Sequence, residues 1–569
     1  MTKPTTDNTA NSSSFAWKIS LSRPMQILLV SVWLLVFSNS TFWTTVWQGI
    51  GGWDNGSPLF LLSLPVLALL WTFGLLTLLA WGRMTKWVLG LFLIVSASAS
   101  YFMNSFGIVI DYDMLTNVVQ TDTREALELL SPRMFIWIAL LGVLPAFLLT
   151  RIETRKFSWK RELSMKLVSV VVALAGIGGI AMSEYQSYAS LFRNHREIRL
   201  QLTPSNVVSA VNGYVRRELK TPTQLEVIGA DAHRQMRVGN AVKPRLTIVV
   251  VGETARAENF ALNGYKRDTN PELSKQNIIN FTNASSCGTA TAVSVPCMFQ
   301  QAGRDDYKPS MATSREGLLD VLKHAGVNVL WRDNNSGCKG ACDRVASVDV
   351  SNLGLADICE AGGECHDEAL LSGLQDYLDT LKDDTVVVLH MKGSHGPSYS
   401  KRYPQAFEHF TPVCQSSELD QCSTESIVNA YDNSLRYTDH VLAQTIELLK
   451  ANQARFDTAM LYMSDHGESL GENGIYLHGL PYAMAPQQQT HIPMILWMSQ
   501  GMEETANLQP GCLQSVKDKA WSQDNLFDSV LGLMAIQTSV YDPARDMFHQ
   551  CQAPQQASTI SGAQAKGVN

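Results

Sequence analysis

The sequence predicts a five-helix transmembrane domain followed by an α/β domain outside the cytoplasm, whose mainly parallel sheet lies between helices. Three observations support this fold class. Long apolar stretches dominate the first 184 of the 569 residues, and the chain is too long for one ordinary core. From residue 244 onward, uniformly apolar β-branched runs alternate with helical patterns, as in a sheet covered on both faces. All ten cysteines lie in this second part, which is typical of disulfides in an oxidising compartment.

Five segments in the first part lack charged residues and are long enough, or nearly so, to cross a bilayer as helices: residues 25–45, 58–81, 87–106, 134–150 and 167–183. A second span follows the first at once and no small-residue cleavage site precedes it, which excludes a cleavable signal peptide. Lys and Arg are concentrated before the first span, between the second and third, and between the fourth and fifth. Basic links stay in the cytoplasm, so we expect the N-terminus inside and everything after residue 184 outside.

The chain is expected to have four parts. Residues 1–184 form the transmembrane domain, and their outer loop, 104–132, is long enough to be functional, although a plain solvated turn explains it equally well. Residues 185–243 mix aromatic and basic side chains and are expected to bridge the domains along the headgroup layer, with a solvated linker helix as the alternative. Residues 244–551 form the outer domain, and 552–569 are predicted to be a disordered tail.

The outer domain places polar residues directly after its apolar runs. The predicted strands are 246–251, 327–331, 385–390, 458–463 and 492–497, with helical patterns at 315–325, 367–381 and 425–450. In open α/β sheets, sites form beyond the carboxyl ends of the strands. The residues found there are Glu253, Asp333-Asn334-Asn335, Gly393-Ser394-His395-Gly396 and Ser464-Asp465-His466-Gly467-Glu468.

These residue types suit a zinc ion, because carboxylates and imidazoles are zinc ligands and a catalytic zinc keeps a position for substrate. Zinc would also lower the pKa of a hydroxyl in the segment 286–297, which two cysteines bracket. Thr291 or Thr289 could then act as the nucleophile, and composition alone does not exclude either. Lys339 and Asn335 are suited to neutralise and orient the oxygens of a phosphate.

Each signal has a simpler explanation when taken alone. A single Glu after a strand is more often a capping or surface residue, and His395 and His478 could be ordinary loop histidines. The cysteines could be reduced or bind metal, but no pair of CxxC units appears. The net charge of −7 is mild and disfavours a nucleic-acid partner.

With these residues in place, the chain resembles the lipid A phosphoethanolamine transferases, the family that includes the mobile colistin-resistance enzymes. The resemblance covers nearly the whole chain and implies an outer domain of the alkaline-phosphatase/sulfatase type. The matching motifs are 251–256 (VGETAR), 286–291 (SCGTAT), 331–335 (WRDNN), 393–397 (GSHGP), 464–474 (SDHGESLGENG) and 477–479 (LHG).

The resemblance implies a role for each site residue. Zinc would be bound by Glu253, Thr291, Asp465 and His466, with Thr291 rather than Thr289 as the nucleophile. The phosphate-facing and catalytic side chains would be Lys339, His395 and His478, with Asn335 beside them and Glu468 near the metal. His395 or His478 would hold a second, weaker zinc. The lipid donor would contact Asn117, Thr121 and Glu125 in the outer loop.

The resemblance also implies the cysteine pairing, which sequence alone cannot fix. The implied pairs are Cys287–Cys297, Cys338–Cys342, Cys359–Cys365 and Cys414–Cys422, with Cys512–Cys551 as the remaining couple.

The predicted function is therefore transfer of phosphoethanolamine from phosphatidylethanolamine to a lipid A phosphate, through a covalent threonine intermediate at a zinc site. The expected enzyme is a monomer in the bacterial inner membrane, with its catalytic domain in the periplasm, and confers resistance to polymyxin (colistin). The alternatives are the same chemistry on the lipopolysaccharide core or a glucan, phosphoglycerol transfer, and a non-catalytic membrane sensor. The last is disfavoured because no ligand or nucleophile is missing from the motifs.

Overall fold

The structure is a computed structural model that describes residues 19–52, 57–121, 123–195, 197–219, 224–235, 243–359 and 364–553. The expected tail lies outside these residues except for its first two positions. The chain forms two compact units. We call Met1–Asn104 with Pro132–Val208 the helical unit, and Ser105–Ser131 with Ser209–Asn569 the sheet unit. The predicted outer loop therefore belongs almost entirely to the sheet unit.

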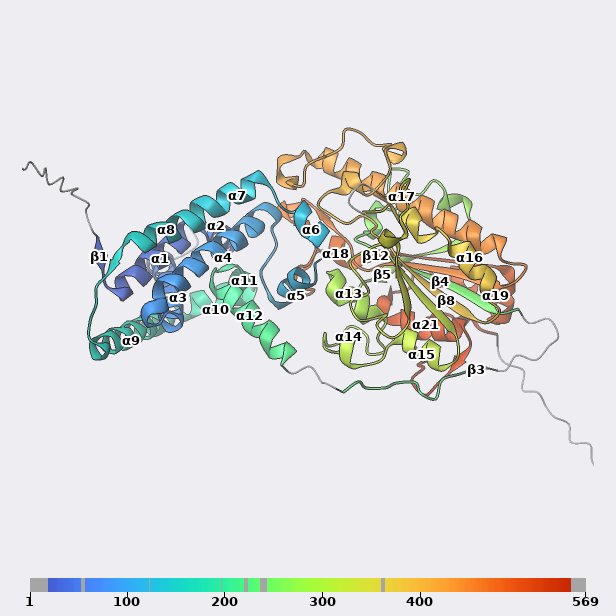
Figure 1. Ribbon diagram of the computed structural model, residues 1–569, viewed down its shortest axis with the longest axis horizontal. Coiled ribbons are helices and arrows are strands. Elements are labelled where there is room, and N and C mark those ends of the chain that lie inside the picture. The colour runs from blue at the N-terminus through green and yellow to red at the C-terminus, as the bar shows by residue number, and fades with distance from the viewer. Residues whose placement is uncertain are drawn as a thin grey trace, which may run out of the picture. The chain divides into compact units, whose positions relative to one another are not determined.

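The helical unit is built from long apolar helices and one short strand pair (Figure 1). Its elements are β1 (Ser20–Leu21), α1 (Arg23–Phe37), α2 (Ser40–Ile50), α3 (Pro58–Leu79), α4 (Thr85–Phe106), α7 (Pro132–Ile138), α8 (Leu144–Arg151), β2 (Glu153–Thr154), α9 (Trp159–Ser183), α10 (Tyr185–Asn194) and α11 (Ile198–Gln201). Helix α12 (Ser205–Glu218) runs from the end of this unit into the sheet unit.

Four helices in the described part of the chain are long and apolar enough to cross a membrane, namely Pro58–Leu79, Gly82–Phe106, Pro132–Arg151 and Trp159–Ser183. Many of their apolar side chains face outward; Leu62 is 71% and Trp87 is 74% exposed. Exposed apolar area on this scale is expected of helices surrounded by lipid.

The predicted first span, 25–45, is not one helix. The structure has α1 and α2 there, bent by 64° at Ser38-Asn39, and the unit has five spans only if this pair counts as one. Asn39 causes the break: its Nδ2 donates to Leu34 O at 2.9 Å and to Thr203 O at 3.1 Å, and its Oδ1 accepts from Thr203 N. An Asn side chain that bonds nearby backbone competes with the helical ladder.

The sheet unit is organised around one eight-stranded sheet. The strand order is β13 (Trp521–Ser522), β5 (Ile278–Ser285), β12 (His491–Met498), β9 (Asp457–Ser464), β4 (Arg245–Gly252), β8 (Thr385–His390), β6 (Asn328–Asp333) and β7 (Ala346–Asp349). Strands β9, β4, β8, β6 and β7 run parallel, and β12 is antiparallel to both of its neighbours. Two small ribbons pair β10 (Ser469–Leu470) with β11 (Tyr476–Leu477), and β3 (His233–Arg234) with β14 (Ile536–Gln537).

Helices cover both faces of the sheet (Figure 1). The helices of this unit are α5 (Tyr112–Gln120), α6 (Thr123–Glu128), α13 (Thr291–Met298), α14 (Met311–Ser314), α15 (Leu318–His324), α16 (Leu374–Thr380), α17 (Thr424–Ala451), α18 (Gln487–Thr490), α19 (Gln500–Thr505), α20 (Cys512–Ser515) and α21 (Leu526–Leu533). Successive residues of β4 alternate between two cores: Val249 and Val251 pack in the core with α15 and α21, whereas Ile248 and Val250 pack in the core with α16 and α17. Burial on both faces explains the uninterrupted apolar runs.

The five predicted strands are confirmed with shifts of a few residues at their ends. Strand β5 was missed because its sequence is half polar, with Asn280, Thr282 and Asn283 between apolar residues. The edge strands β7 and β13 are too short to give a pattern. The expected helix at 367–381 is a short turn followed by α16, because Gly373 adopts a φ of 68° between them.

Candidate active site

Four predicted site residues meet at the carboxyl edge of the sheet. Glu253 follows β4, and Asp465 and His466 follow β9, its hydrogen-bonded parallel neighbour. Thr291 is the first residue of α13. Parallel strands end at the same edge, so residues more than 200 positions apart in sequence lie side by side.

The Thr291 hydroxyl lies within reach of both a carboxylate and an imidazole. Its Oγ1 is 3.3 and 3.2 Å from the two carboxylate oxygens of Glu253, and 3.5 Å from His466 Nε2. His466 Nε2 is also 3.4 Å from Glu253 Oε1 and 3.2 Å from Asp465 Oδ2. The three charged or titratable side chains are fully buried. The start of α13 adds the positive end of a helix dipole beside the Thr291 oxygen.

These groups fit a divalent cation such as zinc. Burial raises the pKa of the Glu253 carboxyl, with a further contribution from Asp465, and burial raises the pKa of Asp465 to about 6. Burial, with His478 second, lowers the pKa of His466 to about 4, so its imidazole is neutral and can donate a lone pair. Asp465 Oδ2 accepts no hydrogen bond from the described residues. Carboxylates gathered without enough hydrogen-bond donors are typical of a cation site.

The backbone beneath the cluster requires a glycine at one position. Gly393, two residues before His395, has a φ of 54°, and a Cβ there would lie 2.6 Å from Glu253 O. The Gly393 N–H donates to Asp367 Oδ2 at 2.8 Å, and Ser394 N donates to Glu253 O at 3.0 Å. The loop after β8 is thereby fixed against the loop after β4, which holds the Glu253 carboxylate in place.

The structure distinguishes the two threonines that composition could not. Thr289 Oγ1 donates to Leu480 O at 2.6 Å and its backbone O accepts from Gly479 N, so its hydroxyl holds the loop that carries His478. Thr291 Oγ1 faces Glu253 and His466. Of the two hydroxyls, that of Thr291 is the one placed for chemistry.

A second group of side chains adjoins the first. His478 Nδ1 lies 2.7 Å from Glu468 Oε2, and Tyr399 donates to Glu468 Oε1 at 2.6 Å. The His478 ring is centred 4.3 Å from that of His466 and 5.6 Å from that of His395. Burial raises the pKa of Glu468 to about 7. His466, Glu468 and His478 offer ligand atoms close enough to share one ion. This group shares His466 with the first cluster, and His466 Nδ1 lies 2.9 Å from Gly467 O, so an ion held here in addition to the first would depend on Glu468 and His478.

Asn335 and Lys339 lie on the loop after β6 and line a groove of about 630 Å³. Asn335 Nδ2 donates to Glu253 Oε2 at 2.7 Å and to Met391 O at 2.9 Å, which ties the groove to the cluster. Lys339 Nζ donates to Ser336 O at 2.9 Å and to Gln120 O at 3.0 Å. The groove therefore lies beside the cluster, and Thr123, in the segment after α5, also lines it.

Helix α5 carries Asn117 and is followed by Thr121, whose hydroxyl donates to Asn117 O at 2.7 Å. The helix packs against α13, the helix that begins with Thr291. The side chain of Glu125, the third expected donor contact, lies outside the described residues.

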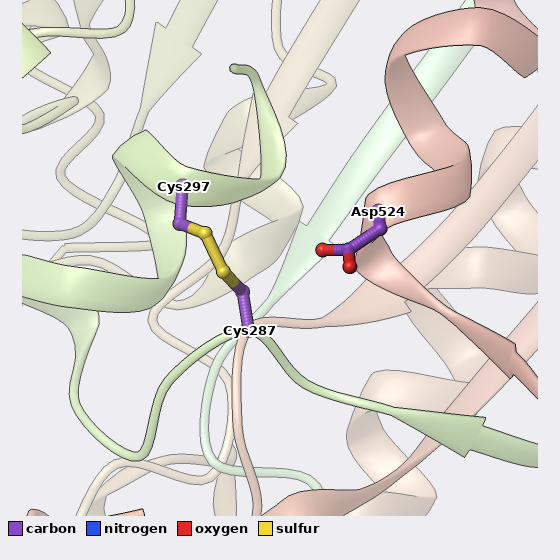
Figure 2. A group of neighbouring side chains, drawn as sticks. All are labelled: Cys287, Cys297 and Asp524. Atoms are coloured by element: carbon purple, nitrogen blue, oxygen red, sulfur yellow. A yellow bond between two sulfur atoms is a disulfide. The ribbon is translucent and has the colours of Figure 1, made fainter. Parts of the chain in front are cut away.

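The ten cysteines form five disulfides, and the pairs are those that the resemblance implies: Cys287–Cys297, Cys338–Cys342, Cys359–Cys365, Cys414–Cys422 and Cys512–Cys551. Cys287–Cys297 joins the segment before Thr291 to the last turn of α13. Figure 2 shows Asp524 beside this disulfide. Both sulfurs are already bonded, so this group of three is not a metal site.

Sequence reasoning missed several residues that support the site. Gln523 Nε2 donates to Ser464 O and Asp465 O, both at 2.7 Å, and its Oε1 accepts from Cys287 N at 2.7 Å. It therefore joins the Asp465 loop to the Thr291 segment. Asp367 binds the backbone below Glu253, as described above. Neither residue lies in a motif, so no local signal points to it.

Comparisons with known proteins match both units. The family model described as Phosphoethanolamine transferase EptA/EptB matches residues 68–219, and the model described as Sulfatase matches residues 245–536. Phosphoethanolamine transferase EptA of Escherichia coli (strain K12) is 43% identical over 94% of this chain and 97% of its own length. Phosphatidylethanolamine transferase Mcr-1 of Escherichia coli is 37% identical over 92% of this chain and 97% of its own.

A solved structure is similar over almost the whole chain. The integral membrane protein lipooligosaccharide phosphoethanolamine transferase A (EptA) from Neisseria meningitidis has a TM-score of 0.91 and 36% identity. The similarity covers 94% of this chain and 100% of that one.

Proposed function

Because the chain belongs to the phosphoethanolamine transferase family EptA/EptB, of the alkaline-phosphatase/sulfatase superfamily, we propose that it transfers phosphoethanolamine from phosphatidylethanolamine to a lipid A phosphate. The name of the Mcr-1 relative supports the donor. A relative that is 28% identical over 90% of this chain is named Kdo(2)-lipid A phosphoethanolamine 7''-transferase, which supports a lipid A acceptor.

One observation carries this proposal: the buried Thr291 hydroxyl, at the start of a helix, within 3.2–3.5 Å of Glu253 and His466. Glu253, Asp465, His466 and Thr291 would hold one zinc ion tightly. The zinc, when bound, would lower the pKa of the Thr291 hydroxyl and offset negative charge on the phosphoryl group. His395, His478 and Glu468 would hold a second, weaker ion or face the phosphate directly.

The reaction is proposed to have two displacement steps. Thr291 Oγ1 first loses its proton to solvent and forms a bond to the phosphorus of phosphatidylethanolamine, and the bond from phosphorus to the diacylglycerol oxygen breaks. His395 supplies the proton that this oxygen needs and is reprotonated from solvent. In the second step, a phosphate oxygen of lipid A bonds to the same phosphorus and the Thr291 Oγ1–phosphorus bond breaks; the Thr291 oxygen takes up a proton from solvent, which regenerates the enzyme.

The remaining predicted residues have binding roles in this scheme. Lys339 and Asn335, at the groove, would orient the phosphate oxygens. Asn117, Thr121 and Glu125 would contact the lipid donor. The proposal includes the four-part division of the chain. Residues 1–184 would cross the inner membrane five times from a cytoplasmic N-terminus, 185–243 would form a bridge, and 244–551 would form a periplasmic catalytic domain. The enzyme is proposed to be a monomer.

The product explains the proposed resistance. Each transferred group brings an ammonium to lipid A and offsets anionic charge at the membrane surface. Cationic peptides such as polymyxin are then attracted less strongly.

The test is lipid A mass spectrometry on cells that carry the wild type, Thr291→Ala or Thr291→Ser. We expect the wild type to add phosphoethanolamine to lipid A, the alanine variant to add none, and the serine variant, which keeps a hydroxyl, to retain part of the activity. Modified lipid A in cells carrying only Thr291→Ala would contradict the mechanism. The same spectra separate the second candidate acceptor, the Kdo region of the core, because the added mass would then be on the Kdo fragment.

A further inference from the structure

Arg402 is a buried arginine that joins three separate parts of the sheet unit. Arg402 follows the turn Tyr399–Lys401, and its side chain is only 2% exposed. Its Nε donates to the backbone oxygen of His395 at 2.7 Å, and its two terminal nitrogens donate to Glu364 and Glu128. A guanidinium presents its donors in a rigid plane, so it fixes the directions of all three partners.

Glu128 reaches this arginine from a distant part of the sequence, 274 positions away. It is the last residue of α6, and its side chain is 8% exposed. Leu127 and Leu130, on either side of Glu128 in the sequence, are 59% and 44% exposed and add little apolar contact. The bonds of Glu128 to Arg402 and Lys401 attach this end of α6.

A second attachment lies at the other end of the same segment, where Lys339 donates to Gln120 O at 3.0 Å. Thr123, at the start of α6, lines the groove together with Asn335, Lys339, Lys392 and Glu364. The segment from Gln120 at the end of α5 to Glu128 at the end of α6 is thus attached at both ends, and its Thr123 forms part of one wall of the groove, which Asn335 ties to Glu253.

We propose that Glu128 is a positioning residue for the transfer reaction: through Arg402 it holds the α6 wall of the groove and fixes the backbone of His395. This inference rests on the proposed function, because it takes the groove as the place of the transferred headgroup and His395 as a residue that faces it. Glu128 does not itself touch the reacting atoms.

Loss of the Glu128 carboxylate is expected to act at the groups that Arg402 contacts, as well as on stability. Arg402 is buried between two carboxylates. Loss of one carboxylate leaves the buried guanidinium charge paired with a single negative charge. The groups that move in response are those bonded to the arginine, namely α6 and the His395 backbone. A displacement of about 1 Å at a reacting group can cost roughly 100-fold in rate.

The test follows the first half-reaction of the full-length enzyme in vesicles that contain increasing mole fractions of phosphatidylethanolamine. Intact-protein mass spectrometry measures formation of the Thr291 adduct. For Glu128→Gln we expect kcat/KM for the donor to fall roughly 10- to 100-fold in the folded enzyme, with an increased KM. The Tm should fall as well, because the buried Arg402 loses one of its two carboxylates. Hydrogen exchange over residues 123–130 should become faster, because the helix loses its attachment.

Lys401→Gln is the matched control. Lys401 Nζ lies 3.4 Å from Glu128 Oε1, on the same carboxylate that Arg402 binds. The Lys401 side chain is 52% exposed, and it is not one of the groups through which Arg402 contacts His395. The Lys401 ammonium is largely solvated and Glu128 keeps its bond to Arg402, so we expect less than about a twofold change. Glu128→Asp keeps the negative charge, so its kcat/KM should lie between those of the wild type and Glu128→Gln. If the glutamine variant does not fold, the aspartate variant is measured in its place.

Wild-type kcat/KM in Glu128→Gln, or a loss no larger than that of Lys401→Gln, would overturn the positioning role and leave the proposed function intact. A fall in Tm with an unchanged kcat and KM of the folded enzyme would overturn it as well, because that result indicates a purely structural contact. Absence of any adduct in the wild type would instead overturn the proposed function, and this inference with it.

Discussion

Two clusters in the sheet unit contain the same residue types, a histidine between carboxylates, in opposite environments. His466 lies between Glu253 and Asp465, fully buried, and burial lowers its pKa to about 4. His440 lies between Glu272, 2.9 Å from its Nδ1, and Glu368, 3.3 Å from its Nε2, with 19% of its side chain exposed. The hydrogen bond to Glu368, reinforced by Glu272, raises the pKa of His440 to about 9.

The two clusters differ in whether their charges balance. The His440 imidazole is protonated at neutral pH and satisfies both carboxylates, so the cluster is a closed ion-pair network. The His466 imidazole is neutral, so it does not balance the negative charge of the buried carboxylates beside it. Only the second arrangement is suited to a cation, and there the Thr291 hydroxyl lies 3.2 Å from Glu253. The hydroxyl at the other cluster, that of Tyr437, donates to Glu368.

We expect the largest loss of activity when one carboxylate of the site cluster is removed. Glu253→Gln keeps the size of the side chain but removes a negative charge and one anionic ligand oxygen. Outer-shell partners of a metal are worth roughly 10- to 100-fold in affinity or activity, so loss of a ligand should cost about 100-fold or more. Zinc content and the rate of adduct formation, measured on the purified enzyme, check this.

His440→Gln is the control for that experiment and should retain the zinc and the rate of the wild type. Equal zinc content in Glu253→Gln and the wild type would contradict the assignment of Glu253 as a ligand. Removal of metal with a chelator should likewise abolish adduct formation, and added zinc should restore it.

An intermediate effect is expected at Thr289, which sharpens the distinction between a structural and a reactive hydroxyl. Thr289→Val removes the donor to Leu480 O and leaves a buried carbonyl unsatisfied, which should cost about 1–3 kcal/mol of stability. The Tm should fall, but the folded variant should still form the adduct on Thr291. Thr289→Ser should recover the stability. A stable Thr289→Val protein that forms no adduct would return Thr289 to consideration as the nucleophile.

The smallest effect concerns the His440 cluster and depends on pH. The pKa of His440 is about 9 in the folded state, above its ordinary value of 6.5, so folding favours the protonated form. The stability gained is fully present below pH 6.5 and is lost as the pH rises through 9. A partly exposed ion pair contributes about 0.2–1 kcal/mol, so the Tm of the wild type should fall about 1–2 °C more than that of His440→Gln over this range. Parallel Tm curves for the two proteins would contradict this.

The α/β domain with a mainly parallel sheet, and the proximity of the candidate site residues, could be predicted from the sequence because both depend on strong local signals. Apolar β-branched runs identified the buried strands, and the residues that follow β4 and β9 marked the carboxyl edge where Glu253, Asp465 and His466 meet. The break at Ser38-Asn39 escaped prediction because it depends on Asn39 bonding to Thr203, a contact between segments 164 positions apart. The contact of Glu128 with Arg402 escaped for the same reason.

The choice between the two threonines shows the same limit at the level of single atoms. Thr289 and Thr291 are the same residue type and lie two positions apart, so only the family resemblance favoured Thr291. What separates them physically is the direction of each hydroxyl, one toward Leu480 O and one toward Glu253, and direction is set by the tertiary structure.

The most direct test of the account is intact-protein mass spectrometry of the wild-type enzyme after incubation with phosphatidylethanolamine and without acceptor. We expect one added phosphoethanolamine group per chain, located on Thr291 by peptide fragmentation, and its disappearance once lipid A is added. A wild-type protein that turns over donor and acceptor but never carries the group, or carries it on another residue, would contradict it.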